Sequence, residues 1–424
     1  MRLASIAALL LAALAPAGVV ASEWDDYLSS DFQNFVWDEE VRTGYEAYAK
    51  QDYEAAAKAL TSAIDKGCKD PVVVFRAAYA LRGAGQADKA AGYFKAATDQ
   101  FQKARTDHHY RPEAHFYLAE FYLQHAKYDE AEWELEQAVE LRKDFTEAYL
   151  LYGDLFAAQG KYAFAAEKYR RAHEADPKNT KPLYNLAVML SKAGKLDDAK
   201  AAIGDARKLE PESDRIGLLA ATVAIAAKDL DGARAEYAAI HERSAGSIDA
   251  LLGLGYIAWR KGEYEEAAKQ YAAVLELEPD HVEALYGLGI AEAKLAKTDE
   301  AIGHLQRVVE LEPKHKNAHY NLGSLYQNKG EFDKAIEQYA EVMKIDPNDR
   351  TPNYNLGVIF IHRRRYAEAR AYLEEAVEAF GPDSQWGRAA QQMLDLVIQI
   401  QEDRPVEIEK ELEKLDKDRP GGES

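Results

Sequence analysis

The sequence is poor in cysteine and in positive charge. Among its 424 residues there is one cysteine, Cys68, so no disulfide can form within the chain and packing must stabilise it. We expect Cys68 to be a small apolar side chain between helices. Lysine and arginine total 53 against 73 aspartate and glutamate residues, which gives a formal net charge of −20. This balance argues against a surface for nucleic acid or for anionic lipid, because both need a basic face.

Motifs of common catalytic sites are also missing from the sequence. There is no H-E-x-x-H motif, since the His-Glu pairs at 173–174 and 241–242 lack the second histidine, and there is no P-loop or G-x-S-x-G. His108 and His109, with His115 and His125 nearby, predict a polar patch and not a metal site, because no carboxylate or thiol spacing completes a ligand set. We therefore expect no enzymatic activity, no cofactor and no metal.

The first 21 residues have the pattern of a secretory signal peptide. Arg2 precedes an apolar run over residues 3–14, and the small residues Val19 and Ala21 lie before a cleavage position at Ser22. The alternative is an uncleaved anchor, because the apolar run over 3–21 is nearly long enough to span a bilayer. We expect export to the periplasm, with secretion or anchoring by this segment as alternatives.

A period of 34 residues organises most of the chain. When each repeat is numbered so that Lys316 is position 1, position 8 is glycine or alanine and position 20 is alanine in ten repeats, and position 32 is proline in five. Apolar residues at 4, 7, 8 and 11, and again at 17, 20, 24 and 27, have the spacing of two amphipathic helices. Small residues at 8 and 20 allow the helices to approach closely, and glycine at 15 favours the turn between them. A lone helical pair cannot bury its apolar faces, so the repeats must stack.

The spacing predicts two repeats over 37–104, an insertion at 105–111 and eight repeats over 112–383. It also predicts a capping helix over 384–401, a charged tail over 402–424, and an acidic and aromatic lead over 22–36. These features resemble the tetratricopeptide repeat family, and in particular exported bacterial arrays of it. The resemblance implies an all-α fold, a right-handed superhelical solenoid of about ten helical hairpins with a capping helix, whose first helices line a concave face.

The repeat over 214–247 departs from the common pattern. It has Lys228 in place of the turn glycine, Ala245 in place of the proline, and Ile240 in place of the alanine at position 27. Because three defining positions differ, we expect a locally softer joint here.

The resemblance places positions 2, 5, 6, 9, 12 and 13 of each repeat on the concave face. No position 5 holds a lysine, so we do not expect the family's clamp for C-terminal carboxylates. Asparagine at position 6 resembles the ladder that holds extended peptides in the repeats of O-linked N-acetylglucosamine transferase, and it occurs here as Asn185, Asn321 and Asn355. Leu219, Gly253 and Gly287 interrupt this ladder, and asparagine is also common at the position, so a peptide-binding role and the lack of one both remain open.

The middle repeats combine an apolar floor with a basic rim at the lining positions. This combination would suit an amphipathic helix or an apolar and acidic segment of a partner, since Tyr and Trp are typical interface anchors. The alternative is that some of these side chains are buried between hairpins. The predicted partner-binding residues are Lys181, Tyr184, Asn185, Arg215, Leu218, Thr222, Leu252, Tyr256, Trp259, Arg260, Tyr286, Ile290, Lys294, Tyr320, Asn321, Tyr354 and Asn355.

These observations predict a non-enzymatic scaffold or adaptor in the bacterial cell envelope. Its partner would be a protein or peptide held in the concave groove, in an assembly complex of the envelope, without nucleic acid and without stable membrane insertion once the signal peptide is removed. Two alternatives are a substrate-recognition subunit of a separate envelope enzyme and a carbohydrate or cell-wall binder, in which tyrosine and tryptophan rings would stack on sugars.

Overall fold

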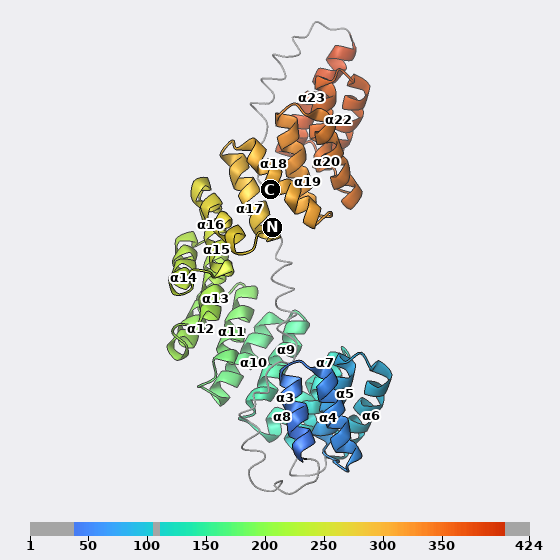
Figure 1. The fold of residues 1–424 in the computed structure, drawn as a ribbon, viewed down its shortest axis with the longest axis vertical. Helices are drawn as coiled ribbons and strands as arrows, with labels where there is room; N and C mark the ends of the chain where they lie inside the picture. Colours follow the sequence, from blue (N-terminus) through green and yellow to red (C-terminus); the bar gives the residue numbers. More distant parts are fainter. Residues whose placement is uncertain (1–37, 105–110, 403–424) are drawn as a thin grey trace. The chain divides into compact units, whose positions relative to one another are not determined.

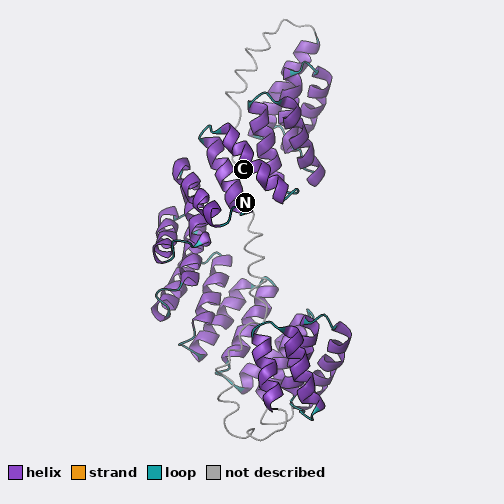
Figure 2. Cartoon of the chain, in the orientation of Figure 1, coloured by secondary structure: helices purple, strands orange, loops and turns teal. Residues whose placement is uncertain are grey.

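A computed structural model describes residues 38–104 and 111–402. Over these ranges the chain forms 21 helices and no strand, and only turns and short loops connect the helices (Figure 2). The predicted signal peptide, the acidic lead, the insertion except for Arg111, and nearly all of the charged tail lie outside the described residues. None of the helices within these ranges is both long and apolar enough to cross a membrane.

The chain divides into two compact units, residues 1–212 and 213–424. The first unit contains α3 (Asp38–Ala49), α4 (Tyr53–Asp65), α5 (Pro71–Gly83), α6 (Ala87–Ala104), α7 (Arg111–Gln124), α8 (Tyr128–Leu141), α9 (Thr146–Ala158), α10 (Tyr162–Ala175), α11 (Thr180–Lys192) and α12 (Leu196–Leu209). The second unit contains α13 (Asp214–Ala226), α14 (Leu230–Arg243), α15 (Ile248–Arg260), α16 (Tyr264–Leu277), α17 (Val282–Lys294), α18 (Thr298–Leu311), α19 (Lys316–Asn328), α20 (Phe332–Ile345), α21 (Thr351–His362), α22 (Tyr366–Phe380) and α23 (Gln385–Gln401).

The helices pack as consecutive hairpins. Each odd-numbered helix from α3 to α21 packs against the even-numbered helix that follows it, and α23 packs against α22 (Figure 1). The apolar face of α23 is closed off, since Ala390, Met393 and Val397 are each 0% exposed. Its Trp386 makes an edge-to-face contact with Tyr354, with ring centroids 5.5 Å apart. The predicted fold of ten helical hairpins and a capping helix is therefore confirmed.

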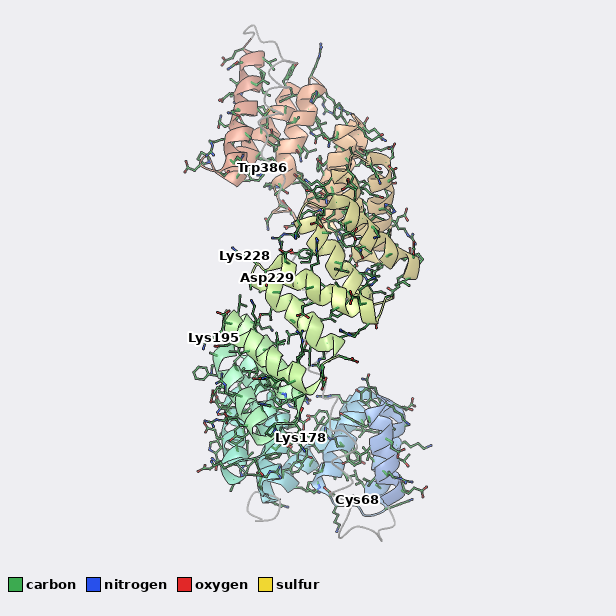
Figure 3. The ribbon with its side chains drawn as sticks, turned by 90° about the vertical axis from the view of Figure 1, so that its left-hand side faces the viewer. Cys68, Lys178, Lys195, Lys228, Asp229 and Trp386 are labelled. Atoms are coloured by element: carbon green, nitrogen blue, oxygen red, sulfur yellow. The ribbon has the colours of Figure 1, made fainter. Side chains whose placement is uncertain are left out.

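The turn of each hairpin contains one residue with positive φ, always at position 15 of the repeat. Five of the ten are glycine and five are not, and the set is Gln51, Gly85, Ala126, Gly160, Gly194, Lys228, Gly262, Ala296, Gly330 and Arg364. Lys228 has φ of 61°, and Figure 3 labels it beside Asp229 at the turn after α13. Left-handed backbone is costly for a residue with a Cβ, so packing of the two helices imposes this turn and glycine only makes it easier.

Small residues hold the two helices of a hairpin close together. The alanine at position 20 is at most 2% exposed in all ten repeats. At position 8, a Cβ added to Gly323 would lie 2.7 Å from Cε1 of Tyr339, the residue at position 24 of the same hairpin. Cys68 is 2% exposed and packs with Leu60 and Val73, as expected for a small apolar side chain.

Candidate functional site

A row of partly exposed apolar residues runs across the first helices of the second unit. On α15, Leu252, Tyr256 and Trp259 follow one another at spacings of four and three residues, so they lie on one face of the helix. Side chains of α13, α17 and α19 extend the row, and α17 packs against both α15 and α19. We call this surface the strip, and its members are Leu218, Thr222, Ile225, Leu252, Tyr256, Trp259, Ile290 and Tyr320.

The aromatic pair of α15 is held in place by its neighbours. Nη1 of Arg260 donates a hydrogen bond of 2.7 Å to the hydroxyl of Tyr256, and the guanidinium lies 5.7 Å from the centre of that ring. Trp259 packs against the core around Tyr271 and Leu288. Its indole Nε1 is enclosed without a hydrogen-bond acceptor in the part of the chain that the structure describes. These contacts fix both rings on the helix before any partner binds, which limits the entropy lost on binding.

Charges are segregated on the two central helices of the strip, α15 and α17. Arg260 and Lys294 are exposed at the C-terminal ends of α15 and α17, and neither forms an ion pair within residues 38–104 and 111–402. Asp249 and Glu283 are exposed at the N-terminal ends of the same helices. The sequence analysis predicted a basic rim and missed this acidic edge, although both carboxylates occupy lining position 2. Burial, together with the carboxylate of Asp249, raises the pKa of the neighbouring Tyr237 to about 12.

Three of the predicted partner-binding residues are buried, so that prediction is wrong for them. Tyr286 is 9% exposed, Tyr354 is 1% exposed and Asn355 is 0% exposed. Tyr286 and Tyr354 belong to the hydrophobic core of this unit. Tyr286 and Asn355 also take part in hydrogen bonds between a tyrosine at position 5 and the asparagine at position 6 of the following repeat. Nδ2 of Asn321 donates to the hydroxyl of Tyr286 at 3.0 Å.

The same contact recurs one repeat later, where Nδ2 of Asn355 donates to the hydroxyl of Tyr320 at 3.1 Å. Each bond joins residues 35 apart and links one first helix to the next. Burial raises the pKa of Tyr286, and the hydrogen bond from Asn321 opposes this rise. The asparagines of these two repeats therefore connect hairpins, and the Asn355 amide is not accessible to a peptide.

The glycines that interrupt the asparagine ladder also have a packing role. A Cβ added to Gly253 would overlap the ring of Tyr237, and one added to Gly287 would lie 2.6 Å from Cζ of Tyr271. Both tyrosines come from the second helix of the preceding hairpin. Position 6 is glycine in these repeats because a ring occupies the space where a side chain would be.

The remaining predicted residues are at least partly exposed. In the first unit, Lys181 is exposed on α11, and Tyr184 and Asn185 are partly exposed on the same helix. In the second unit, Arg215 is exposed in the first turn of α13, and Asn321 is partly exposed on α19. Nothing further in the geometry assigns a partner to the residues of α11.

The sequence analysis missed a buried charge pair in the first unit. Nη1 of Arg76 lies 3.6 Å from Oε1 of Glu120, and the rings of Tyr48 and Tyr117 are each 5.9 Å from the guanidinium. Burial opposes the charge on Arg76, but the nearby Glu120 carboxylate gives a net rise in the pKa of that guanidinium. Arg76 is at position 6 and Glu120 at position 9 of their repeats, so reading all the lining positions would have found the pair.

Two histidines of the first unit, His115 and His125, make ordinary structural contacts. Nδ1 of His115 is 2.6 Å from Oε2 of Glu134, and both side chains are buried. Nδ1 of His125 is 2.7 Å from the carbonyl oxygen of Phe121. His108 and His109 lie outside the described residues. Among residues 38–104 and 111–402, no three His, Cys, Asp or Glu side chains are grouped in a way that could hold a metal ion.

Comparisons with known proteins agree with this architecture. A family model described as "Tetratricopeptide repeat" matches residues 252–315, 290–350 and 320–384. A second, described as "Tetratricopeptide repeat protein 21 C-terminal ARM domain", matches residues 36–216. No curated protein matches the chain.

Several solved structures are similar to parts of the chain. MamA is 28% identical, with a TM-score of 0.36, over 38% of this chain and 93% of that one. YrrB, described as a tetratricopeptide repeat protein with an unusual peptide-binding site, is 23% identical, with a TM-score of 0.38, over 47% and 99%. A tetratricopeptide repeat protein from Parabacteroides merdae is 18% identical, with a TM-score of 0.45, over 60% and 98%.

Proposed function

The chain is a tetratricopeptide repeat protein, and from that premise we propose that it is a protein-interaction scaffold that binds a partner segment on the strip of its second unit. Repeats of this family commonly serve as binding surfaces without catalysis. The observation that carries the proposal is the pair Tyr256 and Trp259, partly exposed on α15 with Leu252 and Ile290 beside them. Tyrosine and tryptophan contribute much of the binding energy at protein interfaces.

The charges of the strip indicate the charge pattern that a partner segment should have. An amphipathic helix, or an extended segment with apolar and acidic residues, would place its apolar side chains on the rings of α15. Its carboxylates would lie toward Arg260 and Lys294, because these cations have no ion-pair partner within the described ranges. Basic residues of the partner would lie toward Asp249 and Glu283. The two charged edges therefore favour one direction of binding over the opposite one.

Cross-linking from a single position tests the binding surface. A photo-reactive benzoylphenylalanine replaces Tyr256 in one variant, and in the control it replaces Leu277, which is 50% exposed at the end of α16 and does not belong to the strip. We expect a defined protein to be cross-linked from position 256 and not from position 277. The same set of cross-linked proteins from both positions, or none from position 256, would contradict the proposal.

A charge reversal tests the direction of binding with the partner so identified. Arg260→Glu should weaken binding by about 1–2 kcal/mol in low salt, with a smaller effect in high salt, because an exposed charge contact is screened. Asp249→Lys should also weaken binding, because the new cation would face basic residues of the partner. Unchanged binding in both variants would show that the charged edges do not orient the partner.

We also propose that the protein works in the cell envelope, on the basis of residues 1–21 alone. Their sequence is that of a secretory signal peptide, and secretion or anchoring by this segment are the alternatives that one experiment distinguishes. Fractionation of cells that produce the full chain should place a product shortened by 21 residues in the periplasm. The shortened product in the medium would indicate secretion, and a full-length product in the membrane fraction would indicate anchoring. A full-length product in the cytoplasm would contradict export.

A further inference from the structure

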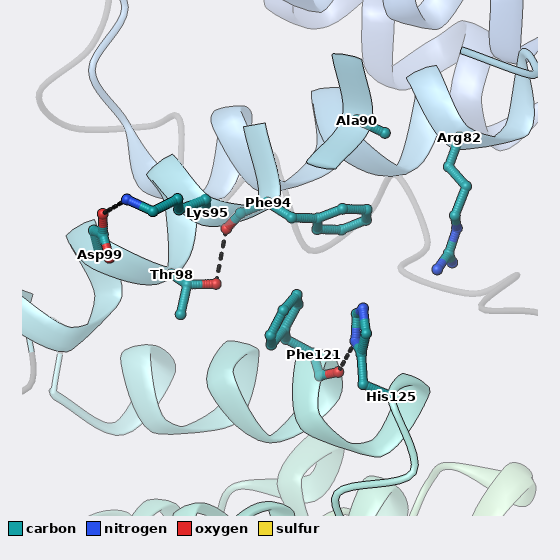
Figure 4. Close-up of a pocket in the computed structure, with 8 residues that line it drawn as sticks. All are labelled: Arg82, Ala90, Phe94, Lys95, Thr98, Asp99, Phe121 and His125. Atoms are coloured by element: carbon teal, nitrogen blue, oxygen red, sulfur yellow. Dashed lines mark hydrogen bonds and ion pairs between the residues drawn. The ribbon is translucent and has the colours of Figure 1, made fainter. Parts of the chain in front are cut away.

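The first unit has a separate cavity between α5, α6 and α7, far in sequence from the strip. Its volume is about 460 Å³, which is within the usual range for a pocket that holds a small ligand or a few side chains (Figure 4). Ala90, Phe94 and Phe121 form apolar walls, and Arg82 and His125 lie at one side.

Arg82 carries the positive charge of this cavity. Its guanidinium lies 4.8 Å from the centre of the Tyr79 ring and 5.5 Å from that of Phe94. Nη2 donates to Oε1 of Gln124 at 2.6 Å, which is a neutral acceptor, and Arg82 has no carboxylate partner in the described ranges. The aromatic rings hold the guanidinium in place and leave most of its donors available to a carboxylate, which arginine binds well.

The other charges at the rim cancel. Nζ of Lys95 and Oδ2 of Asp99 are 3.4 Å apart, on successive turns of α6. Arg82 therefore supplies the net charge at the rim, which favours an anionic ligand.

His125 supplies the complementary hydrogen-bond acceptor. Its Nδ1 is 2.7 Å from the carbonyl oxygen of Phe121, so in the neutral ring Nδ1 must carry the proton and donate. Nε2 is then an acceptor, and it has no partner among the residues that the structure describes. The ring of His125 also lies against that of Phe121, with centroids 4.2 Å apart. A ligand with an N–H group next to a carboxylate, and with an aromatic side chain against the wall of Phe94 and Phe121, would contact all of these groups at once.

We propose that this cavity binds an acidic peptide segment that carries an aromatic residue. The carboxylate pairs with Arg82, a peptide or indole N–H donates to Nε2 of His125, and the aromatic side chain packs against the wall that Phe94 and Phe121 form together, with their ring centroids 5.8 Å apart. This binding site is independent of the strip, and it adds a second, anion-selective contact to the scaffold.

Calorimetry with a defined peptide tests the proposal on the full chain. The probe is acetyl-Glu-Phe-Asp-Leu-Glu-amide. Arg82→Gln should lower its affinity about 10- to 100-fold, the effect of losing hydrogen bonds to a charged group. The matched control is Arg170→Gln, which removes an exposed arginine of the same unit that pairs with Glu167 on its own helix. Thr98→Phe, which fills the cavity, should abolish binding, and circular dichroism must show that each variant is folded.

Changes in the probe distinguish binding in the cavity from binding elsewhere on the protein. A peptide with glutamine and asparagine in place of its acids, or alanine in place of its phenylalanine, should bind at least about tenfold more weakly. Equal affinity of wild type and Arg82→Gln would overturn the proposal, and equal binding of free N-acetylphenylalanine would overturn its assignment to a peptide. Because the strip is proposed to bind a segment of similar chemistry, Tyr256→Ala shows which surface holds the probe, and an unchanged affinity is the result expected for the cavity. A loss in that variant would place the probe on the strip and refute the cavity, whereas failure of the strip alone would leave the cavity result intact.

Discussion

The hydrogen bonds between successive first helices give the sharpest prediction, because they decide what the asparagines at position 6 do. Nδ2 of Asn321 is 3.0 Å from the hydroxyl of Tyr286, and Tyr286 is 9% exposed. A neutral hydrogen bond of this kind contributes about 0.5–1.5 kcal/mol net. Asn321→Ala should therefore lower the free energy of unfolding by about 1 kcal/mol, since it removes the donor and leaves the tyrosine hydroxyl without it.

A double-mutant cycle isolates this bond from the remaining effects of each substitution. Tyr286→Phe removes the acceptor, and the two changes together should cost about 1 kcal/mol less than the sum of the single changes. Asn185→Ala is the matched control, because Asn185 has the same repeat position, is partly exposed and lacks a hydrogen-bond partner in the described part of the chain. Its effect should stay within about 0.5 kcal/mol.

Urea unfolding followed by circular dichroism measures these differences. Because repeat arrays do not always unfold in one step, hydrogen exchange of the amides in α17 and α19 should accompany it and should be faster in Asn321→Ala. A coupling energy near zero, or an equal cost for Asn185→Ala, would refute the structural role. Loss of partner cross-linking in Asn321→Ala without any loss of stability would favour the peptide ladder instead.

Packing and charge lead to three more expected outcomes. Lys228→Gly should raise the free energy of unfolding by about 0.5–1 kcal/mol in urea, because glycine adopts φ of 61° without strain, and a decrease would contradict the strain assigned to this turn. Gly287→Ala should destabilise by about 1–3 kcal/mol, since its Cβ would lie 2.6 Å from Cζ of Tyr271, and an unchanged thermal midpoint would show that the ring can move aside. Burial disfavours the charge of Asp349, but hydrogen bonds from Lys316 and neighbouring groups lower the pKa of this carboxyl overall. The charged carboxylate therefore stabilises the folded state fully above about pH 4, and this stabilisation is lost as the pH falls through the lowered pKa. Asp349→Asn should remove this part of the acid sensitivity in urea unfolding between about pH 2 and pH 5, and a pH profile identical to that of the wild type would contradict it.

The fold could be predicted from the sequence because each hairpin is specified locally. A small residue at position 8 and alanine at position 20 recur in phase, and in the structure those alanines are buried in every repeat. In the turns, the position in the repeat predicts the backbone conformation better than the type of residue does. Lys228 and Arg364 adopt the left-handed conformation at the position where other repeats have glycine. The softer joint expected in this repeat stays a prediction, and the backbone of Lys228 follows the pattern of the other turns.

The candidate site could be predicted only in part, because the environment of a lining residue depends on the next repeat. Tyr286 and Tyr184 both occupy position 5, but Asn321 follows the first after 35 residues and Leu219 follows the second. Tyr286 is bonded to that asparagine and buried in the core of the second unit, whereas Tyr184 is partly exposed. Comparing the residue at position 5 with the residue at position 6 of the following repeat would have distinguished the bonded Tyr286 from Tyr184. When each repeat is considered alone, the asparagines at position 6 resemble a peptide-binding ladder, and their hydrogen bonds to the tyrosines of the preceding repeat are not evident.

The same comparison explains where the strip lies within the second unit. From α17 onward, tyrosine hydroxyls and asparagine amides join neighbouring first helices and use the polar groups that a partner would need. On α13 and α15, position 5 is Leu218 or Leu252, so no such bond can form, and the large side chains move to positions 9 and 12 as Tyr256 and Trp259. Apolar surface that no neighbouring helix covers costs free energy unless a partner buries it. A partner segment should therefore bind mainly across α13, α15 and the adjoining face of α17, and substitutions on α21 should affect stability without affecting binding.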